Sequence, residues 1–413
     1  MSTLPVLSLE DTRLHLAAIV GDEYADLREG SVTVAPADIA QIAATLRFAY
    51  DNEMAVIPGG GGTKRGWGNP VAAPIRLSTK RLRSVREHSW HDMTCTVEAG
   101  ASWSAMQAEL ARHGQMVALD PLWPDHATVG GIAAVNDSGA LRLRYGGLRD
   151  LILGMTIVLA DGTIAKTGGK VVKNVAGYDL HKLMTGSFGT LGVIAEVNFR
   201  LHPIEEHTRT WSVTVTDAAQ FSAPLRALLD AQIVPSSVQM RVEREQCAVE
   251  IKIAAVPECL DEHRDQLKAI FAPLAFTESK EEVWQARQEL FDGGYPVLLK
   301  ASLLPTTLCT VLSELQQRAA SQGVEVHALA QATGLTTIAL RAAAEPLAAC
   351  IADLRETTRE SGGSVVALQL PDEVRGRLDV WAYSSDALPL MREIKRRFDP
   401  RQILNPGRFV GNI

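Results

Sequence analysis

The 413-residue sequence has few cysteines and no arrangement of them that would bind a metal. Iron–sulfur clusters and structural zinc sites need closely spaced thiolates. No C-x-x-C pair is present, so isolated buried thiols are the better interpretation of the five cysteines. The ten histidines also lack metal-ligand spacing such as H-E-x-x-H. The sequence therefore predicts no metal site.

Long apolar runs and an excess of positive charge are missing as well. No uninterrupted apolar run reaches the ~18 residues that a membrane-spanning helix needs. Residues 1–11 have neither the basic nor the apolar region of a secretory signal. The net charge of -7 argues against nucleic-acid binding, which depends on clustered Lys and Arg. We therefore expect a cytoplasmic protein that binds no nucleic acid.

The length of the chain predicts more than one domain, because a domain averages ~150 residues. A change in glycine content and in the pattern of elements along the chain predicts where the domains divide. Glycine-rich loops and strands fill residues 1–204, with subdomains expected at about 1–79 and 80–204. From residue 205 glycine becomes rarer, and strands alternate with amphipathic helices in a roughly repeated rhythm. This rhythm predicts an α+β domain with an antiparallel sheet over 205–383. Residues 384–413 contain a helix and a Pro- and Gly-rich turn, which we expect to dock on the rest of the protein.

Hydrophobic periodicity gives the individual elements. We expect an N-terminal helix and loop over 1–35, a helix from Pro36, and a tight hairpin turn at Asp161-Gly162. The helix over 388–398 is predicted to bury Leu390, Met391, Ile394 and Phe398. The other expected strands are 54–57, 75–77, 93–99, 151–159, 193–201, 211–215, 249–253, 297–302 and 336–340, and the other expected helices are 102–113, 180–184, 221–231, 261–271, 306–322 and 346–360.

The feature that indicates function is the run Ala55–Thr63, in which a short apolar strand ends in Pro58 and four glycines. Consecutive glycines let backbone N–H groups converge on an anion such as phosphate, although a flexible surface loop would look the same. Two common phosphate motifs are excluded. A Walker A loop would have Lys where Trp67 follows Gly66, and a Rossmann fingerprint requires a helix where Trp67 and Pro70 stand. Gly186, Gly189 and Gly192 form a second glycine loop whose spacing also differs from the Rossmann pattern.

Several motifs together resemble the vanillyl-alcohol-oxidase-type (PCMH-type) FAD-binding domain. They are Pro58–Thr63, Val129-Gly130-Gly131, the stretch from Lys173-Asn174-Val175-Ala176-Gly177-Tyr178-Asp179-Leu180 to Gly189-Thr190-Leu191-Gly192-Val193-Ile194, and the closing Phe398-Asp399-Pro400 and Leu404-Asn405-Pro406-Gly407-Arg408. Residues 148–154 and 172–179 are most similar to the FAD-binding subunits of glycolate oxidase, called GlcE-type. The resemblance covers about residues 35–203 and the last 30. It implies a two-subdomain FAD domain, an α+β cap domain and a C-terminal segment that returns to the FAD domain.

The resemblance also implies which residues hold FAD. Pro58–Thr63 would hold the pyrophosphate with backbone amides, and Asn405 would reach the flavin edge. The ribityl and isoalloxazine side, with Tyr145 among the candidates near the flavin, would be lined by Pro121, Thr128, Gly130, Gly131, Asn136, Ser138 and Gly139. The adenine and ribose would be bracketed by Gly189, Gly192, Val193 and Ile194. Many relatives attach FAD covalently through a histidine in the first glycine loop. Each glycine-loop position here is Gly or Thr, so we expect non-covalent FAD.

The catalytic residues are not evident from the sequence. Relatives that oxidise 2-hydroxy acids commonly carry H-x-G-D-G-x-x-H in the second domain, whereas residues 208–413 contain only His263 and His327, neither in that context. Oxidation needs a base for the hydroxyl proton while the flavin takes the hydride. His126 is a candidate base, with a structural role as the alternative. Arg142, Arg144 and Arg149 are candidate carboxylate ligands, with a solvated or partner-docking basic loop as the alternative.

The resemblance implies an FAD-dependent oxidoreductase acting on CH–OH groups, as one subunit of a glycolate oxidase complex. It would contribute to oxidation of glycolate to glyoxylate, or of D-lactate, beside a catalytic flavoprotein subunit and an iron–sulfur subunit. Any association with the inner membrane would be peripheral and made through that complex. Two alternatives stay open: a self-sufficient 2-hydroxy-acid dehydrogenase, and a non-catalytic scaffold.

Overall fold

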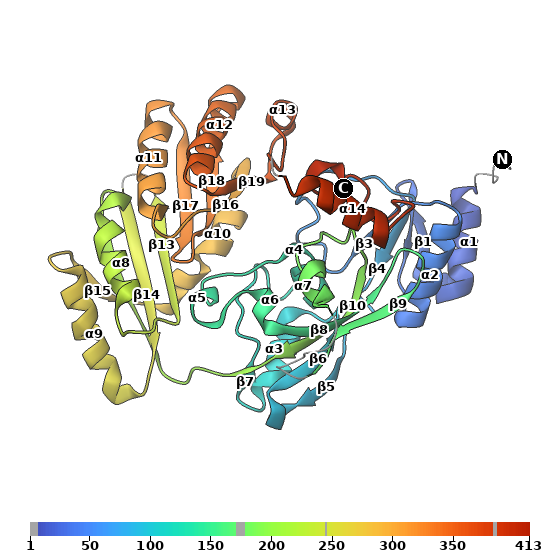
Figure 1. The fold of residues 1–413 in the computed structure, drawn as a ribbon, viewed down its shortest axis with the longest axis horizontal. Coiled ribbons are helices and arrows are strands. Elements are labelled where there is room, and N and C mark those ends of the chain that lie inside the picture. The colour runs from blue at the N-terminus through green and yellow to red at the C-terminus, as the bar shows by residue number, and fades with distance from the viewer. Residues whose placement is uncertain (1–6, 171–177, 244–245, 383–385) are drawn as a thin grey trace. The chain divides into compact units, whose positions relative to one another are not determined.

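The computed structural model describes residues 7–170, 178–243, 246–382 and 386–413 (Figure 1). The chain forms two compact units. The first comprises Met1–Asp137, Gly147–Ile204 and Ser384–Ile413, and the second comprises Ser138–Gly146 and Glu205–Tyr383. Residues 138–146, expected in the FAD domain, thus group with the second unit. The motif residues Lys173–Gly177 lie outside the described residues.

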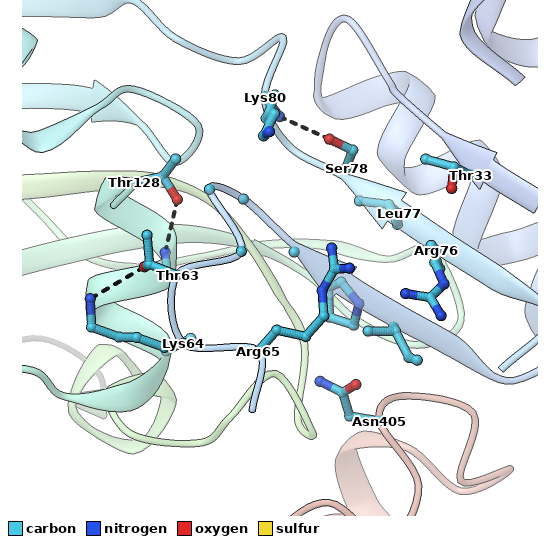
Figure 2. A pocket seen from close by; sticks show the side chains of 18 of the residues that line it. Thr33, Thr63, Lys64, Arg65, Arg76, Leu77, Ser78, Lys80, Thr128 and Asn405 are labelled. Carbon is cyan, nitrogen blue, oxygen red and sulfur yellow. Dashed lines mark hydrogen bonds between the residues drawn. The ribbon is translucent and has the colours of Figure 1, made fainter. Parts of the chain in front are cut away.

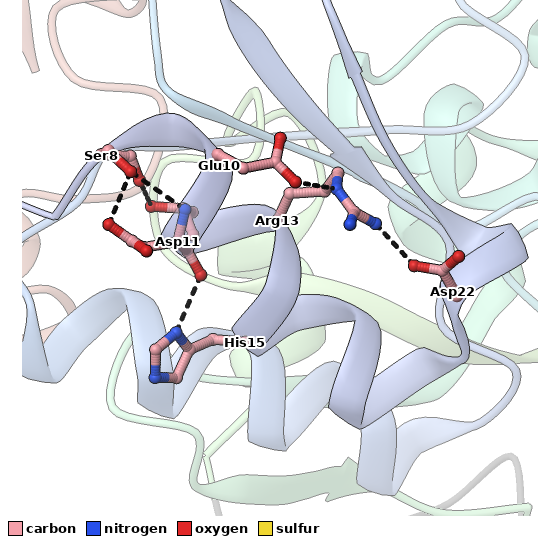
Figure 3. Close-up of polar contacts among 7 residues, drawn as sticks. Ser8, Glu10, Asp11, Arg13, His15 and Asp22 are labelled. Carbon is pink, nitrogen blue, oxygen red and sulfur yellow. Dashed lines mark hydrogen bonds and ion pairs between the residues drawn. The ribbon is translucent and has the colours of Figure 1, made fainter.

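The first unit begins with α1 (Leu9–Val20), whose start is fixed by a capping serine (Figure 3). Ser8 Oγ accepts a hydrogen bond from the backbone N–H of Asp11 at 3.1 Å, which satisfies one of the free donors of the first turn. Arg13 then pairs with Glu10 at 2.9 Å and with Asp22 at 2.6 Å, beyond the helix end. These exposed pairs raise the pKa of Arg13, chiefly through the hydrogen bond to Asp22.

A four-stranded sheet follows, in the order β1-β2-β4-β3. Its strands are β1 (Ala25–Arg28), β2 (Ser31–Val34), β3 (Val56–Gly59) and β4 (Ile75–Ser78). Helix α2 (Ile39–Asp51) is capped by Asp38 and packs Ile42 and Leu46 into the core beneath the sheet. The expected helix at Pro36 and the strands at 54–57 and 75–77 are present. The loop expected before Pro36 is wrong in part, because β1 and β2 pair there as a short hairpin.

The second sheet of this unit has the order β5-β6-β10-β8-β9, with every neighbouring pair antiparallel. The expected hairpin at Asp161-Gly162 joins β8 to β9, and the positive φ of +81° at Gly162 explains the glycine. The segment around Gly130 is a helix, α4, capped by Thr128. The elements are β5 (Val85–Ser89), β6 (Thr94–Glu98), α3 (Trp103–Ala111), β7 (Gln115–Met116), α4 (Val129–Val135), α6 (Leu148–Leu151), β8 (Ile152–Val158), β9 (Ile164–Gly168), α7 (Leu180–Met184), β10 (Val193–Arg200) and β11 (His202–Pro203).

The second unit is built on one antiparallel sheet in the order β15-β12-β14-β13-β17-β18-β16-β19. Each half repeats a β-α-β-β-α-β unit, and the pairing of β13 with β17 joins the halves. This confirms the repeated rhythm and the antiparallel sheet, although four strands were not predicted (β13, β15, β17 and β19). The bounds are α5 (Arg142–Tyr145), β12 (Thr208–Val215), α8 (Ser222–Asp230), β13 (Ser237–Glu243), β14 (Gln246–Ala254), α9 (Pro257–Phe271), β15 (Phe276–Ser279), α10 (Ala286–Asp292), β16 (Val297–Ser302), α11 (Leu308–Ser321), β17 (Glu325–Gln331), β18 (Leu335–Arg341), α12 (Ala344–Glu360), β19 (Ser364–Gln369) and α13 (Asp372–Arg375).

The C-terminal segment returns to the first unit, as expected, through α14 (Leu388–Phe398). The helix bounds are those predicted, and the inward face is right in part, because Ile394 and Phe398 pack against the core of the first unit. Leu390 is 62% exposed, and the buried residue of the helix is Lys395. Its ammonium donates to Asp399 Oδ2 at 2.7 Å and to the carbonyl oxygens of Thr190 and Leu404 at 2.8 and 2.9 Å. Leu404 in turn bridges to Val56 of β3. A buried cation with all three donors used therefore fixes the closing turn to the first sheet.

A second buried charge, Glu250 of β14, makes the stability of the protein pH-dependent. Burial raises its pKa to about 7, against the opposing effect of Arg241, whose Nε lies 2.7 Å from the carboxylate. The folded state therefore binds this proton more tightly than the unfolded state. Its contribution to stability is complete below about pH 4.5, the ordinary value, and is lost as the pH rises through 7.

We predict that Glu250→Gln flattens this pH dependence. Between pH 5 and pH 8, the loss of unfolding free energy should be smaller in the variant than in the wild type by roughly 1 to 3 kcal/mol. Urea titration at both pH values measures the difference. Glu243→Gln is the matched control, because Glu243 binds the same arginine but is exposed. Equal slopes in the wild type and in Glu250→Gln would contradict the assignment.

Candidate functional site

A cavity of about 520 Å³ lies in the first unit around the four-glycine loop (Figure 2). The end of β3 and the loop 59–65 form one side, β2 and β4 form the floor, and α4 and the closing turn at Asn405 complete the lining. This volume lies in the range of small-molecule and cofactor sites. The glycine loop is thus a wall of a cavity.

The inner glycines of the loop are required by packing. A Cβ on Gly60 would lie 2.0 Å from Thr128 Oγ1, and a Cβ on Gly61 would lie 1.9 Å from the carbonyl oxygen of His126. Gly62 has a φ of +81°, which L side chains rarely adopt. The loop therefore touches the segment before α4 at distances that leave no room for a side chain.

Gly59 differs from the other three glycines. Its φ is not positive, and a Cβ there would meet no protein atom within 4 Å. Gly59 also lines the cavity. Neither conformation nor packing within the protein requires glycine at this position, so the open space beside it is where a ligand could approach the backbone closely.

Three segments far apart in the sequence meet beside this loop. A Cβ on Gly189 would lie 3.0 Å from both Pro58 Cγ and Asn405 Nδ2, and Gly189 has a φ of +69°. The amide of Asn405 donates to the carbonyl oxygen of Phe188 at 2.7 Å. That bond fixes the orientation of the Asn405 amide. The two glycine loops and the closing turn are therefore parts of one site.

Buried polar atoms without partners show that this site fits a ligand with hydrogen-bonding groups. Among the described residues, Asn405 Oδ1 and Asn136 Oδ1 are buried and make no hydrogen bond. Such atoms cost free energy unless something satisfies them. Asn136 ends α4 in a left-handed conformation, and Asn405 has a φ of 43°. Asn405, which lines the cavity, is thus held in place with an acceptor oxygen unused, as expected of a site for FAD, whereas Asn136 follows the lining residue Val135 but does not itself line the cavity.

One buried ion pair and one buried arginine brace the wall of the cavity. Lys64 is 7% exposed, and its ammonium lies 3.2 Å from Asp137 Oδ2 and 3.2 Å from the carbonyl oxygen of Leu122. Arg408 donates to the carbonyl oxygen of Arg65 at 2.6 Å, and burial lowers its pKa. These contacts connect the loop after Gly62 to the closing turn, and they position the backbone around the cavity.

The sequence-predicted FAD residues divide into two groups. Those that line the cavity are Pro58, Gly59, Gly60, Gly61, Gly62, Thr63, Thr128, Gly131 and Asn405. The others do not line it: Pro121, Gly130, Asn136, Gly189, Gly192, Val193 and Ile194 in the first unit, and Ser138, Gly139 and Tyr145 in the second. Gly130 packs on Ala99, and Val193 and Ile194 pair with β8 inside the second sheet. Their contact with the cofactor stays a prediction.

Most of the candidate catalytic side chains are engaged elsewhere. Arg144 lies 3.4 Å from Glu205 and 3.2 Å from Ser236 Oγ, and Tyr145 donates to Glu205 at 2.7 Å. Burial, followed by that hydrogen bond, raises the pKa of Tyr145 to about 12. Arg149 donates to the carbonyl oxygen of Thr185. The arginine whose guanidinium makes no such contact among the described residues is Arg142. His126 is exposed beside the glycine loop, and it is the backbone of this residue that contacts Gly61.

Sequence reasoning missed the polar floor of the cavity. Thr33, Arg76, Ser78 and Lys80 line this floor, and Arg65 lines the cavity from the loop. Arg76 and Ser78 alternate with the buried Ile75 and Leu77 along β4, a period of two that indicates a strand with one polar face. That signal was available in the sequence, but it did not show that this face borders the glycine loop.

The described residues hold neither a metal-binding cluster nor a membrane-spanning helix. No group of three His, Cys, Asp or Glu side chains there could hold a metal ion. None of the described helices is long and apolar enough to cross a membrane.

Comparison with known proteins supports the cofactor assignment. Residues 31–168 match the family described as FAD binding domain, and residues 380–409 match the family described as FAD linked oxidases, C-terminal domain. The chain is 25% identical to the glycolate oxidase subunit GlcD of Bacillus subtilis over 91% of this chain and 88% of that protein. It is 27% identical to the D-lactate dehydrogenase of Archaeoglobus fulgidus, over 93% of this chain and 92% of that one.

The fold has solved counterparts. The structure of p-cresol methylhydroxylase with substrate bound superposes with a TM-score of 0.77, at 15% sequence identity, covering 97% of this chain and 96% of the other. At this identity the likeness concerns the fold. The resemblance noted from the motifs is confirmed, and one of the relatives is the GlcD subunit of a glycolate oxidase. The chain is an FAD-linked oxidoreductase, in which residues 31–168 match the FAD binding domain and residues 380–409 match the family of the C-terminal domain.

Proposed function

We propose that the chain is the FAD-binding subunit of a glycolate oxidase complex and contributes to oxidation of glycolate, or D-lactate, to the 2-oxo acid. The observation that carries the proposal is the cavity on the four-glycine loop, with the unused amide oxygen of Asn405 at its edge. The substrate class comes from the relatives, a glycolate oxidase subunit and a D-lactate dehydrogenase. We include in the proposal a cytoplasmic location, with any contact with the inner membrane made through partner subunits.

Bound FAD would supply the hydride acceptor for this reaction. The backbone of Gly59–Thr63 and the amide of Asn405 would hold it. For the self-sufficient alternative, Arg142, whose guanidinium makes no hydrogen bond or ion pair with the described residues, stays the candidate for binding the substrate carboxylate. Only in the alternative of a self-sufficient enzyme would this chain supply the base, and His126, which is exposed beside the loop, is the candidate for it.

The scarcity of histidine in the second unit favours a subunit over a self-sufficient enzyme. His327 binds Glu325 at 3.1 Å and packs beside Tyr295, so it is part of the sheet surface. His263 is half-buried on α9, and His207 is exposed just before β12. Since a proton acceptor must accompany hydride removal, we infer that a catalytic flavoprotein subunit supplies it, with an iron–sulfur subunit to take the electrons.

We also propose that FAD is bound non-covalently. Covalent attachment would need a nucleophilic side chain such as His, Cys or Tyr, and none occurs among the described residues that line the cavity. We predict that acid precipitation of the purified protein leaves the yellow flavin in the supernatant. Absorbance at 450 nm in pellet and supernatant measures this, and flavin retained in the washed pellet would contradict the proposal.

Anaerobic reduction distinguishes the proposed role from its alternatives. The purified chain should show a flavin spectrum, and glycolate or D-lactate should bleach it only after the partner subunits are added. The reason is that the chain has a cofactor site, whereas the second unit offers no evident acceptor for the hydroxyl proton that must leave the substrate with the hydride. Prompt bleaching of the isolated chain would instead identify a self-sufficient dehydrogenase. A chain that binds no flavin would be a scaffold.

A further inference from the structure

The cavity of the first unit carries a surplus of positive charge. Six Lys and Arg side chains line it, whereas Glu29 is the one acidic residue among the described lining residues. Arg28 pairs with Asp26, Lys64 pairs with Asp137, and Arg408 is held by backbone carbonyl oxygens. For Arg65, Arg76 and Lys80, no carboxylate partner is found in the part of the chain that the structure describes. An uncompensated cluster of cations in a concave site attracts an anion.

The register of the first sheet places Arg76 at the centre of the cavity floor. Arg76 lies opposite Thr33 of β2 on one side and Ile57 of β3 on the other, and Ser78 lies opposite Gly59. All five residues line the cavity. Ser31 Oγ accepts a hydrogen bond from Arg76 Nε at 3.0 Å. This bond orients the guanidinium and leaves its terminal nitrogens without a described partner.

Arg65 approaches the same space from the loop (Figure 2). A Cβ on Gly62 would lie 3.7 Å from Arg65 Nη2, so the guanidinium lies over the glycine loop. The backbone carbonyl oxygen of Arg65 is held by Arg408 at 2.6 Å, which fixes the start of the side chain. Arg65 and Arg76 therefore flank the open space beside Gly59 from two different elements.

We propose that Arg65 and Arg76 form a clamp for the diphosphate of the bound dinucleotide, and that they set the preference for FAD over flavins with fewer phosphates. This inference rests on the proposed FAD site and goes beyond the glycine motif. The backbone amides of the loop provide partial positive charges only, whereas two guanidinium groups provide whole charges and bidentate donors for phosphate oxygens. Hydroxyl groups of Thr33 and Ser78 lie beside them as further donors.

The experiment titrates the flavin-free full-length protein with FAD, with riboflavin and with ADP. Quenching of flavin fluorescence measures the binding of FAD and riboflavin, and competition with FAD measures the binding of ADP. The variants are Arg65→Gln, Arg76→Gln and the double variant. Arg76→Lys keeps the charge and should recover part of the loss. Arg83→Gln is the matched control, because Arg83 is an exposed arginine that does not line the cavity. Thermal unfolding of each flavin-free variant checks that the fold is intact.

We expect each single variant to weaken FAD and ADP at least about tenfold, which corresponds to the loss of one charge-assisted phosphate contact. Riboflavin affinity and the control variant should match the wild type. FAD binding by the wild type should weaken with added salt, and less so in the double variant. Unchanged FAD affinity in both single variants, or an equal loss of riboflavin affinity, would overturn the clamp alone. A wild-type chain that binds neither FAD nor ADP would overturn the proposed function and the clamp with it.

Discussion

The site depends on a contact between two stretches of backbone. Gly60 and Gly61 touch Thr128 and the carbonyl oxygen of His126 so closely that no side chain fits between them. Because Thr128 also caps α4, the same contact places the helix that carries Gly131 and ends at Asn136. The position of the cavity relative to β3, β4 and α4 thus depends on Gly60 and Gly61 having no Cβ atom.

The closing turn depends on a second constraint, the buried pair of Lys395 and Asp399. Lys395 donates to Thr190 in the second glycine loop and to Leu404, while Asp399 accepts from the backbone N–H groups of Ile403 and Leu404. Since Leu404 bridges to β3, this pair sets the distance from Asn405 to Pro58 and Gly189. The last thirty residues are therefore part of the cofactor site, although more than 300 residues separate them from the first loop.

The sequence predicted the elements whose signals are local. The glycine loop, the hairpin at Gly162 and the bounds of α14 depend on neighbouring residues, and the structure has them where expected. The inward face of α14 was predicted only in part. Ile394 and Phe398 pack inward as expected, but Leu390 is exposed, and Lys395 is buried through contacts with residues 190 and 404, which no local pattern reveals. The grouping of residues 138–146 with the second unit and the role of Arg76 in the cavity floor were missed for the same reason. They depend on pairings between distant strands and on contacts such as that of Arg144 with Glu205.

The central claim, that FAD lies against the glycine loop, is tested most directly at Gly59. An alanine there meets no protein atom within 4 Å and has a permitted φ, so the flavin-free Gly59→Ala variant should unfold at the temperature of the wild type. Its methyl group would enter the open space of the cavity. Gly66→Ala is the matched control, because Gly66 has the same freedom but lies outside the lining. We predict that Gly59→Ala weakens FAD about tenfold or more, as expected of overpacking a tight contact, and that Gly66→Ala does not. Wild-type FAD affinity in Gly59→Ala would contradict the account.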